Sequence, residues 1–459
     1  MRSLIVLVAL GALAATAHAD AHQERAWSIY KQLVEIDTTQ STGDTYKAAK
    51  AMGARLRAAG FPAADVKVFK TAAKRGNLVA RYRGTGKQKP ILLVAHIDVV
   101  EAKRADWSTD PMKLVEKDGY AYARGTTDDK YMAAAWVANF IRWKQERYRP
   151  DRDLVIVLEC DEEISDRHSY GIRWLLAKQR PLLDAELALN EGGAVGVKNG
   201  KPIWNAIQTT EKLFQSFWLE VKNSGGHSSQ PRKDNAIYML ANGLARLEKY
   251  AFPVQLNDTT RVYFQKMATI ETGQTAADMK AVLAAKPDPA AVERLASQPP
   301  FNAQLRTTCV ATRLEGGHAE NALPQLARAM VNCRLVPGHR VEDVQKTLEH
   351  VLADPKIAVT AEPRDTGSEP SPVNKVLFAA VEKLTAKFWP GIAVLPVMST
   401  GATDGRYLRN AGIPTYGHSG LATDIFDYRA HGKDERVQLT AFHTGHQYLY
   451  ELVKQLSGG

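Results

Sequence analysis

Residues 89–100 read KPILLVAHIDVV, and this stretch decides the fold of the 459-residue chain. Its centre, ILLVA, is continuously apolar, which is typical of a strand buried on both faces of a parallel sheet. His96 and Asp98 follow at the carboxyl end, where residues two positions apart share one face of the strand. A buried strand that ends in polar side chains predicts an α/β sheet with a site at its carboxyl edge.

The neighbouring segments repeat this alternation of strand and helix. Residues 75–84, 153–163 and 185–193 have the apolar runs of strands, and residues 130–147 have the spacing of a long amphipathic helix. The order β-α-β-α-β predicts a mostly parallel sheet with helices on both faces.

The pattern changes after about Thr210. Residues 214–224 alternate like a half-exposed strand, and residues 235–250 are typical of a helix. Residues 274–300 predict two short helical stretches broken by prolines, in what looks like an insertion. We therefore expect a smaller α+β domain within the α/β domain. The expected division is a signal peptide at 1–19, a first catalytic-domain segment at 20–211, an inserted domain at 212–365 and a second catalytic-domain segment at 366–459.

The first residues predict export. Arg2 precedes an apolar run from Leu4 to Ala15, and Ala17-His18-Ala19 is an A-x-A cleavage pattern. The apolar run is shorter than the ~20 residues of a membrane-spanning helix. We therefore expect cleavage before Asp20, no stable membrane anchor, and a periplasmic or secreted protein.

Charge and cysteine content exclude other classes. The net charge of +10 comes from 60 Lys+Arg against 50 Asp+Glu, without a run of five basic residues, so we expect a generally basic surface and no nucleic-acid partner. Three cysteines are too few for a disulfide framework. Cys309 and Cys333 lie in two strand-like stretches, and a disulfide or two buried thiols would both suit them. Cys160, in an apolar strand, is expected to stay free.

Other segments also place acidic residues or a histidine next to a predicted strand or helix, as residues 89–100 place His96. Taken singly, each has an ordinary explanation, such as a structural His–Asp pair, acids at a helix N-terminus, a helix cap or a surface histidine. Taken together they supply two histidines and three carboxylates, which suit two divalent ions that share one carboxylate. One glutamate is then left beside the ions as a general base. The ligand candidates are His96, Asp128, Glu163, Glu191 and His431, and the remaining glutamate is Glu162.

The motifs also occur in the order found in a known family. They are AHIDVV, RGTTDDK, DEE, NEGG, GGHSSQP, GGHAENALP, TDGRYLRNAGIP and AHGKDE. In this set the chain resembles the dinuclear zinc peptidases that include aminoacylase, carnosinase and the glutamate-releasing carboxypeptidases (peptidase family M20, clan MH). The resemblance implies a phosphorylase/hydrolase-like zinc peptidase domain with an inserted lid and dimerisation domain.

The resemblance also implies how the metals are held. His96 and Glu191 resemble the ligands of one zinc, and Glu163 and His431 resemble those of the other. Asp128 resembles the bridging ligand, with a cis peptide bond after it. The implied cofactor is two Zn²⁺, although Co²⁺ or Mn²⁺ would suit the same ligands.

Further roles carry over in the same way. Asp98 resembles the acid that orients the first histidine, and Glu162 resembles the general base. His227 resembles the histidine that stabilises the oxyanion, often donated by the other subunit. Asn321 and Arg406 resemble substrate-binding residues, and the guanidinium of Arg406 suits a terminal carboxylate.

These observations give one leading hypothesis and two alternatives. We expect an exported zinc-dependent metallo-exopeptidase that hydrolyses short peptides, of carboxypeptidase or dipeptidase type, through a metal-bridging hydroxide with Glu162 as general base, and that forms a homodimer through the inserted domain. The first alternative is an aminoacylase-like N-acyl amino acid amidohydrolase. Glu191 stands where many carboxypeptidases and dipeptidases of the family have Asp, which argues against a strict glutamate-releasing enzyme. The second alternative, a non-catalytic exported amino-acid- or peptide-binding protein, is disfavoured because all five ligands and Glu162 are present.

Overall fold

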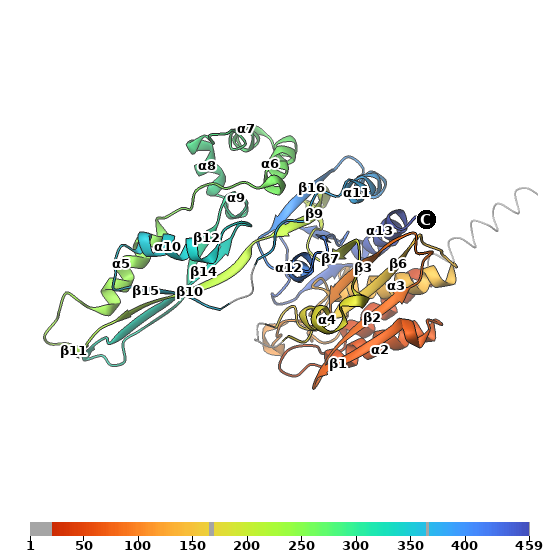
Figure 1. The fold of residues 1–459 in the computed structure, drawn as a ribbon, viewed down its shortest axis with the longest axis horizontal. Helices are drawn as coiled ribbons and strands as arrows, with labels where there is room; N and C mark the ends of the chain where they lie inside the picture. Colours follow the sequence, from red (N-terminus) through yellow and green to blue (C-terminus); the bar gives the residue numbers. More distant parts are fainter. Residues whose placement is uncertain (1–20, 165–168, 364–366, 459) are drawn as a thin grey trace, which may run out of the picture. The chain divides into compact units, whose positions relative to one another are not determined.

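The computed structural model describes residues 21–164, 169–363 and 367–458 (Figure 1). The expected signal peptide and the expected boundary at 365/366 lie outside these ranges. The chain divides into two compact units. The first unit comprises Met1–Gln208, Ser371–Leu395 and Thr403–Gly459, and the second comprises Thr209–Pro370 and Pro396–Ala402.

The short stretch Pro396–Ala402 belongs to the second unit, although the sequence pattern assigned it to the second segment of the catalytic domain. Its backbone is bonded to second-unit residues. The carbonyl oxygen of Ser399 accepts from the backbone N–H of Lys212 at 2.9 Å, and that of Met398 accepts from the Gln304 side chain at 2.9 Å. Such contacts join residues far apart in sequence, so local pattern did not indicate them.

The large sheet has the order β1-β2-β6-β3-β7-β17-β9-β8-β18, with β16 paired to β9. The central pairs β6–β3, β3–β7 and β7–β17 are parallel, and antiparallel pairs lie on either side of them. The expected α/β fold around a parallel sheet is confirmed. The strands are β1 (Val66–Ala72), β2 (Arg75–Tyr82), β3 (Gln88–His96), β6 (Arg152–Glu159), β7 (Leu187–Asn190), β8 (Val195–Lys198), β9 (Lys201–Glu211), β16 (Ala393–Ser399), β17 (Thr415–Gly417) and β18 (Ala422–Asp424).

Both faces of this sheet are covered, which explains why the centres of β3 and β6 are continuously apolar. On β3, Leu93 and Ala95 belong to one apolar cluster and Leu92 and Val94 to another, because successive side chains point to opposite faces. The first cluster includes the helix at residues 21–34, α2 (Thr45–Ala58), α3 (Lys130–Gln145), α11 (Lys375–Phe388) and α13 (Leu439–Leu456). The second includes α4 (Ile172–Gln179) and α12 (Gly405–Asn410).

A small sheet in the first unit joins distant parts of the chain. It has the order β19-β5-β4, from strands β4 (Val115–Lys117), β5 (Tyr120–Tyr122) and β19 (Arg436–Gln438). The pairing of β19 with β5 is antiparallel and places Arg436 opposite Tyr122. Short 3-10 helices complete this unit at η1 (Ala63–Asp65), η2 (Arg104–Asp106) and η3 (Arg180–Leu182).

The second unit is built on an antiparallel sheet of order β12-β14-β10-β15. Helices α5 (Ala236–Glu248) and α10 (Val341–Leu352) pack with it around one apolar cluster. Strand β12 forms one edge of the sheet. The strands are β10 (Leu213–Lys222), β12 (Thr308–Gly316), β14 (Leu326–Leu335) and β15 (Ala358–Ala361), with a separate short pair of β11 (Gly226–His227) and β13 (Ala322–Leu323).

The two cysteines of the second unit form a disulfide. Cys309 on β12 and Cys333 on β14 are direct partners in the strand pairing, with their Cα atoms 4.0 Å apart. Cys160 is a buried thiol, as expected. Of the two alternatives left open by the sequence, the structure has the disulfide.

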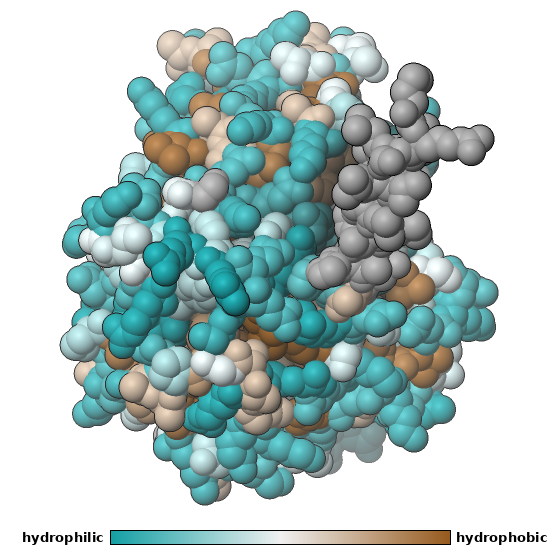
Figure 2. Space-filling model, turned by 90° about the vertical axis from the view of Figure 1, so that its right-hand side faces the viewer, coloured by the Kyte–Doolittle hydropathy of each residue, from teal (hydrophilic) through white to brown (hydrophobic). Residues whose placement is uncertain are grey.

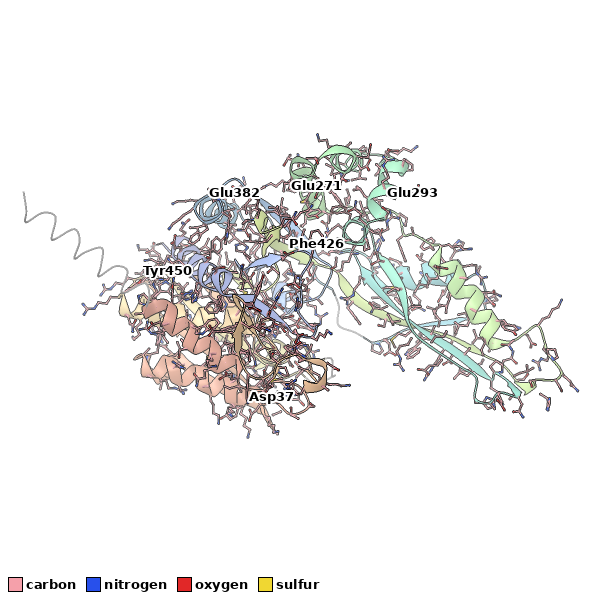
Figure 3. All side chains as sticks on the ribbon, turned by 180° about the vertical axis from the view of Figure 1, so that it is seen from behind. Asp37, Glu271, Glu293, Glu382, Phe426 and Tyr450 are labelled. Atoms are coloured by element: carbon pink, nitrogen blue, oxygen red, sulfur yellow. A yellow bond between two sulfur atoms is a disulfide. The ribbon has the colours of Figure 1, made fainter. Side chains whose placement is uncertain are left out.

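The inserted stretch of the second unit is helical. It contains α6 (Asp258–Ile270), α7 (Gly273–Ala281), α8 (Pro289–Ala296) and α9 (Pro299–Leu305). The sequence predicted two helices in 274–300, and these are α7 and α8. Pro289 and Pro299 begin helices rather than break them, because the first helical turn needs no N–H donor from proline. Glu271 at the end of α6 and Glu293 in α8 mark this group in Figure 3.

Among the described residues, no helix has both the length and the apolar character that crossing a bilayer requires. On the face drawn in Figure 2, hydrophilic residues predominate and hydrophobic residues form separate patches.

Candidate metal centre

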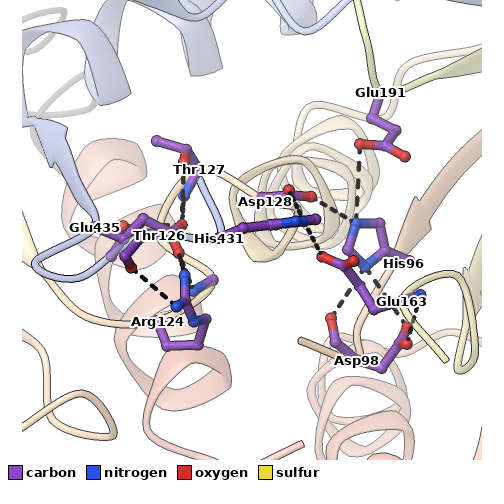
Figure 4. A network of polar contacts seen from close by, with 12 residues as sticks. His96, Asp98, Arg124, Thr126, Thr127, Asp128, Glu163, Glu191, His431 and Glu435 are labelled. Carbon is purple, nitrogen blue, oxygen red and sulfur yellow. Dashed lines mark hydrogen bonds and ion pairs between the residues drawn. The ribbon is translucent and has the colours of Figure 1, made fainter. Parts of the chain in front are cut away.

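Five side chains meet at the carboxyl edge of the parallel strands in the first unit (Figure 4). Each comes from a separate segment, since parallel strands bring their carboxyl ends to one edge. The peptide bond between Asp128 and Asp129 is cis, as the resemblance implied. His96 ends β3, Asp128 precedes α3, Glu163 follows β6, Glu191 follows β7, and His431 lies between β18 and β19.

Asp128 lies between the two histidines. Its Oδ1 is 2.8 Å from Nε2 of His96, and its Oδ2 is 3.2 Å from Nε2 of His431. Glu163 Oε1 is 2.8 Å from the same nitrogen of His431, and Glu191 Oε2 is 3.9 Å from Nε2 of His96. The cluster therefore consists of two histidine–carboxylate groups that share one aspartate.

The two groups differ in burial. The side chain of His96 is 1% exposed, whereas that of His431 is 57% exposed. Nδ1 of His96 lies 3.0 Å from the carbonyl oxygen of Asp98 and 3.6 Å from its Oδ1. The other carboxylate oxygen of Asp98 accepts a hydrogen bond from the backbone N–H of Glu163 at 3.0 Å. Asp98 thus fixes the ring of His96, as a residue behind a metal ligand commonly does.

The pKa values show that the cluster is short of positive charge. Burial opposes protonation of His96, but its hydrogen bonds with Asp128 and Asp98 outweigh burial and raise its pKa well above the usual value. Hydrogen bonds with Asp128 and Glu163 raise the pKa of His431 to about 10. Burial raises the pKa of Glu191 well above its usual range. Protons are thus held where carboxylates crowd together, and a cation would serve the same purpose.

The donor set fits divalent metal ions. Ligand atoms of His96, Asp128 and Glu163 lie within 4.8 Å of one another, and so do those of His96, Glu162 and Glu191. Mixed nitrogen and carboxylate ligands suit Zn²⁺, and also Co²⁺ or Mn²⁺. Both oxygens of Asp128 already face different histidines, as a shared ligand requires. The first unit therefore contains a candidate metal-binding cluster.

Glu162 lies beside this cluster, where the sequence pattern placed a general base. Burial raises the pKa of Glu162 well above its usual value, and the charges of Asp404 and Glu163 act in the same direction, while His96 opposes them. Asp404 is itself 4% exposed. Asp404 was not singled out from the sequence, although it lies in the quoted motif TDGRYLRNAGIP.

Arg406, expected to bind a substrate carboxylate, lies on α12 in the first unit. Its Nη2 donates to the Tyr407 hydroxyl at 2.6 Å, and its guanidinium carbon is 4.6 Å from the centre of the Tyr407 ring. The positive charge of Arg406 also lowers the raised pKa of Asp404.

His227 and Asn321 are in the second unit, where the short β11–β13 pair brings them together. The backbone N–H of Ser228 donates to the carbonyl oxygen of Asn321 at 3.1 Å. Nδ1 of the exposed His227 accepts from the backbone N–H of Ser229 at 3.2 Å, with the Ser229 hydroxyl 2.7 Å away. Neutral His227 therefore carries its proton on Nε2, which makes this nitrogen a hydrogen-bond donor.

A second polar network adjoins the cluster, and the sequence reasoning missed it (Figure 4). Its centre is the ion pair between Arg124 and Glu435, 2.6 Å apart, whose side chains are 3% and 0% exposed. Arg124 begins the motif RGTTDDK and Glu435 ends the motif AHGKDE, which was the available signal. Their pairing spans 311 positions, so spacing alone could not reveal it.

Comparisons with known proteins agree with this fold and show the family of the chain. The chain belongs to peptidase family M20/M25/M40, whose family model matches residues 92–455. It is 29% identical over 382 residues to the N-fatty-acyl-amino acid synthase/hydrolase PM20D1 of Homo sapiens, covering 80% of this chain and 74% of that protein. It is 27% identical over 393 residues to a protein named probable carboxypeptidase S-like 2 of Dictyostelium discoideum, covering 82% and 74%.

A solved structure shares the fold. The M20 family metallo-carboxypeptidase Sso-CP2 from Sulfolobus solfataricus superposes with a TM-score of 0.70 at 18% identity, covering 94% of this chain and 98% of that one. The sequence-based assignment to this family is confirmed. The chain is a hydrolase of the metallopeptidase and amidohydrolase type.

Proposed function

We propose that this chain is an exported zinc-dependent metallo-exopeptidase that cleaves an amide bond of a short peptide, in the manner of a carboxypeptidase or dipeptidase. One observation carries the proposal: Asp128 is shared by two histidine–carboxylate groups, with Glu162 alongside. The membership in a peptidase family and the names of two relatives support the reaction class.

The ligands divide between two sites for Zn²⁺. His96 and Glu191 would hold one ion, Glu163 and His431 the other, and Asp128 both. The ions, when bound, supply Lewis acidity that activates water and polarises the amide carbonyl.

Glu162 performs the proton transfers. It takes a proton from the attacking water and later returns it to the leaving nitrogen. Its burial makes its carboxylate a stronger base than an exposed glutamate, as the raised pKa indicates. Asp98 keeps the ring of His96 oriented throughout.

Three residues are assigned to contact particular groups of the substrate. His227 presents an Nε2–H donor that suits the developing oxyanion. Arg406 offers a guanidinium for the free carboxylate, and Asn321 a side-chain amide for the substrate backbone.

A second candidate function is the hydrolysis of N-acyl amino acids. It is favoured by the name of the human relative, an N-fatty-acyl-amino acid synthase/hydrolase. Both candidates cleave an amide whose nitrogen belongs to an amino acid with a free carboxylate, so they use the same site. The acyl side of the substrate distinguishes them.

We also propose a homodimer through the second unit. Edge strand β12 exposes Val310 and Leu314, whose exposed fractions are 60% and 70%. Beside it, a cavity of about 540 Å³ is lined by α5 and β12, including Leu240 and Leu244. An open strand edge next to an apolar surface suits pairing with a second copy. Leu314→Glu should yield monomers in light scattering, and an unchanged mass would contradict the dimer.

The decisive experiment combines metal analysis with a substrate panel, on protein that starts at Asp20. About two zinc ions per chain and turnover abolished by a chelator are expected. Dipeptides and N-acyl amino acids are compared in the same panel, and the better class decides between the two candidates. Protein that stays inactive with zinc, yet binds a peptide, would instead identify a binding protein.

Export has its own test. We expect the full chain, expressed in a bacterium, to leave the cytoplasm and to begin at Asp20 when its N-terminus is sequenced. An uncleaved chain in the cytoplasm would contradict export.

A further inference from the structure

The buried carboxylate of Glu435 accepts hydrogen bonds from every residue of the segment 124–127. Oε2 of Glu435 accepts from Nη1 of Arg124 at 2.6 Å and from the backbone N–H of Gly125 at 3.0 Å. Oε1 accepts from the backbone N–H of Thr127 at 2.8 Å, its hydroxyl at 3.0 Å, and the hydroxyl of Thr126 at 3.3 Å. With five donors on its two oxygens, Glu435 is tied to every residue from 124 to 127.

This segment leads directly into the shared ligand. Asp128 follows Thr127, and Glu435 itself comes four positions after His431. A second contact runs the same way, because Nη2 of Arg124 donates to the carbonyl oxygen of Gly432 at 2.9 Å. The Arg124–Glu435 pair therefore holds the segment that carries Asp128 against the segment that carries His431.

The loop that carries His431 needs such support. His431 has a φ of 63° and Asp434 a φ of 54°, a left-handed conformation that residues other than glycine adopt when surrounding contacts impose it. Asp434 is also held, since its carboxylate accepts from the backbone N–H of Ser108 at 2.8 Å and from its hydroxyl at 2.9 Å. The position of His431 thus depends on contacts made by neighbouring residues.

We propose that Glu435 is a positioning residue that sets the affinity for one of the two metal ions. It fixes His431 against Asp128, and so it supports the ion assigned to Glu163, His431 and Asp128. The inference rests on the proposed function, because it assumes that these residues bind metal. Glu435 is not itself a ligand, since both of its oxygens are taken up by protein donors.

The effect is selective because the other site has its own support. His96 is part of β3, and its Nδ1 faces Asp98. Glu191 directly follows β7, where the backbone of Gly193 donates to the carbonyl oxygen of Gly417 at 3.1 Å. Loss of Glu435 leaves these contacts in place.

The test is a metal titration of metal-free Glu435→Gln and the parent protein. We expect the parent to bind two equivalents of Co²⁺ or Zn²⁺. In the variant, one equivalent should bind about 10–100-fold more weakly, as is usual when a group behind a ligand is removed. The other equivalent shares Asp128 but has the separate support of His96 and Glu191, so it should weaken much less. Visible absorption of the Co²⁺ protein shows whether the weakened equivalent also changes its coordination.

A matched control separates positioning from general stability. Asp65 is 8% exposed and accepts two hydrogen bonds from Arg83, at 3.0 and 2.6 Å, near the β1 edge of the sheet. Asp65→Asn removes a largely buried carboxylate that also pairs with an arginine, Arg83, whose side chain is 67% exposed, and should leave both metal affinities unchanged. The melting temperature of each metal-free variant is measured alongside.

Thr127→Val gives a second, milder variant. It removes the Thr127 hydroxyl from Glu435 and should weaken the same equivalent by a smaller factor. If Glu435→Gln does not fold, the metal affinities of Thr127→Val test the inference in its place. Unchanged affinities, or equal weakening of both equivalents, would overturn the inference. A parent protein that binds no metal would overturn the proposed function instead.

Discussion

The sheets of the two units differ in how much of their surface is covered. In the first unit, the centre of β3 is apolar on both sides, and His96 stands at its carboxyl end, where four other segments meet it. In the second unit, β14 alternates between buried and half-buried residues, and edge strand β12 is largely exposed. A doubly covered sheet can hold charged ligands at its rim in fixed positions. An open sheet leaves surface for association.

The two candidate catalytic groups show the same difference. Glu162 is half-buried, and the charges of His96, Asp404 and Glu163 act on its carboxylate. His227 is exposed and is oriented by Ser229 of its own turn. Changes at the metal ligands of the first unit should therefore affect metal binding and chemistry together, whereas changes at Glu162 or at His227 of the second unit should affect the rate while the metals stay bound.

The largest effect is expected for Glu162→Gln. The amide cannot accept the proton of the attacking water, so kcat should fall by about 10²–10⁴-fold. Because Glu162 is not assigned as a ligand, metal content by elemental analysis should stay near that of the parent. Glu186→Gln, at an exposed carboxylate paired with Arg152, serves as control. Full activity in Glu162→Gln would contradict the mechanism.

His227→Ala tests the second unit. Loss of one oxyanion donor should lower kcat by about 10²–10³-fold. KM and the two metal affinities should change little. The comparison between the units would fail if His227→Ala lost a metal ion.

Removal of the disulfide should act on the second unit alone. The bridge joins residues 24 positions apart, for which the loop-entropy relation gives about 3–4 kcal/mol. Calorimetry of the double variant Cys309→Ser, Cys333→Ser should show a lower transition for this unit and an unchanged one for the first unit. If both transitions shifted equally, the units would not unfold independently.

The smallest effect concerns pH. In the metal-free protein His431 keeps its proton up to about pH 10, and a metal ion must displace that proton. Metal affinity should therefore rise with pH between 6 and 9, by up to about tenfold per pH unit for each proton released. Titration calorimetry in buffers of different ionisation enthalpy counts these protons.

Two variants sharpen the pH comparison. His431→Asn should release about one proton fewer, because it removes the protonated group. His227→Ala should release as many protons as the parent. An affinity that does not depend on pH would show that His431 is not a ligand.

The sequence predicted the fold where side-chain pattern follows directly from burial. The apolar runs at 89–100 and 153–163 became β3 and β6, because both faces of these strands are covered. Helix α4 starts at Ile172 rather than at Ser169. The reason is tertiary: the carboxylate of Asp161 accepts from the backbone N–H of Tyr170 at 2.6 Å.

From the sequence, site residues could be predicted only where they lie in short recognisable motifs. His96, Asp128 and Glu163 were found through motifs that each occupy a few neighbouring positions, and the structure brings them together. The pairing of Arg124 with Glu435 was missed, since it depends on how distant segments pack. The roles of His227, Asn321 and Arg406 stay predictions.

The wide spacing of the ligands also sets the order of events during synthesis. His431 contacts Glu163 across 268 positions, and Arg124 contacts Glu435 across 311. Since chains emerge from the ribosome N-terminus first, the strands that carry His96 and Glu191 can fold while the last ligand is still missing. The complete centre forms only when nearly the entire chain has been made. Prematurely terminated products, which lack His431, would therefore be inert.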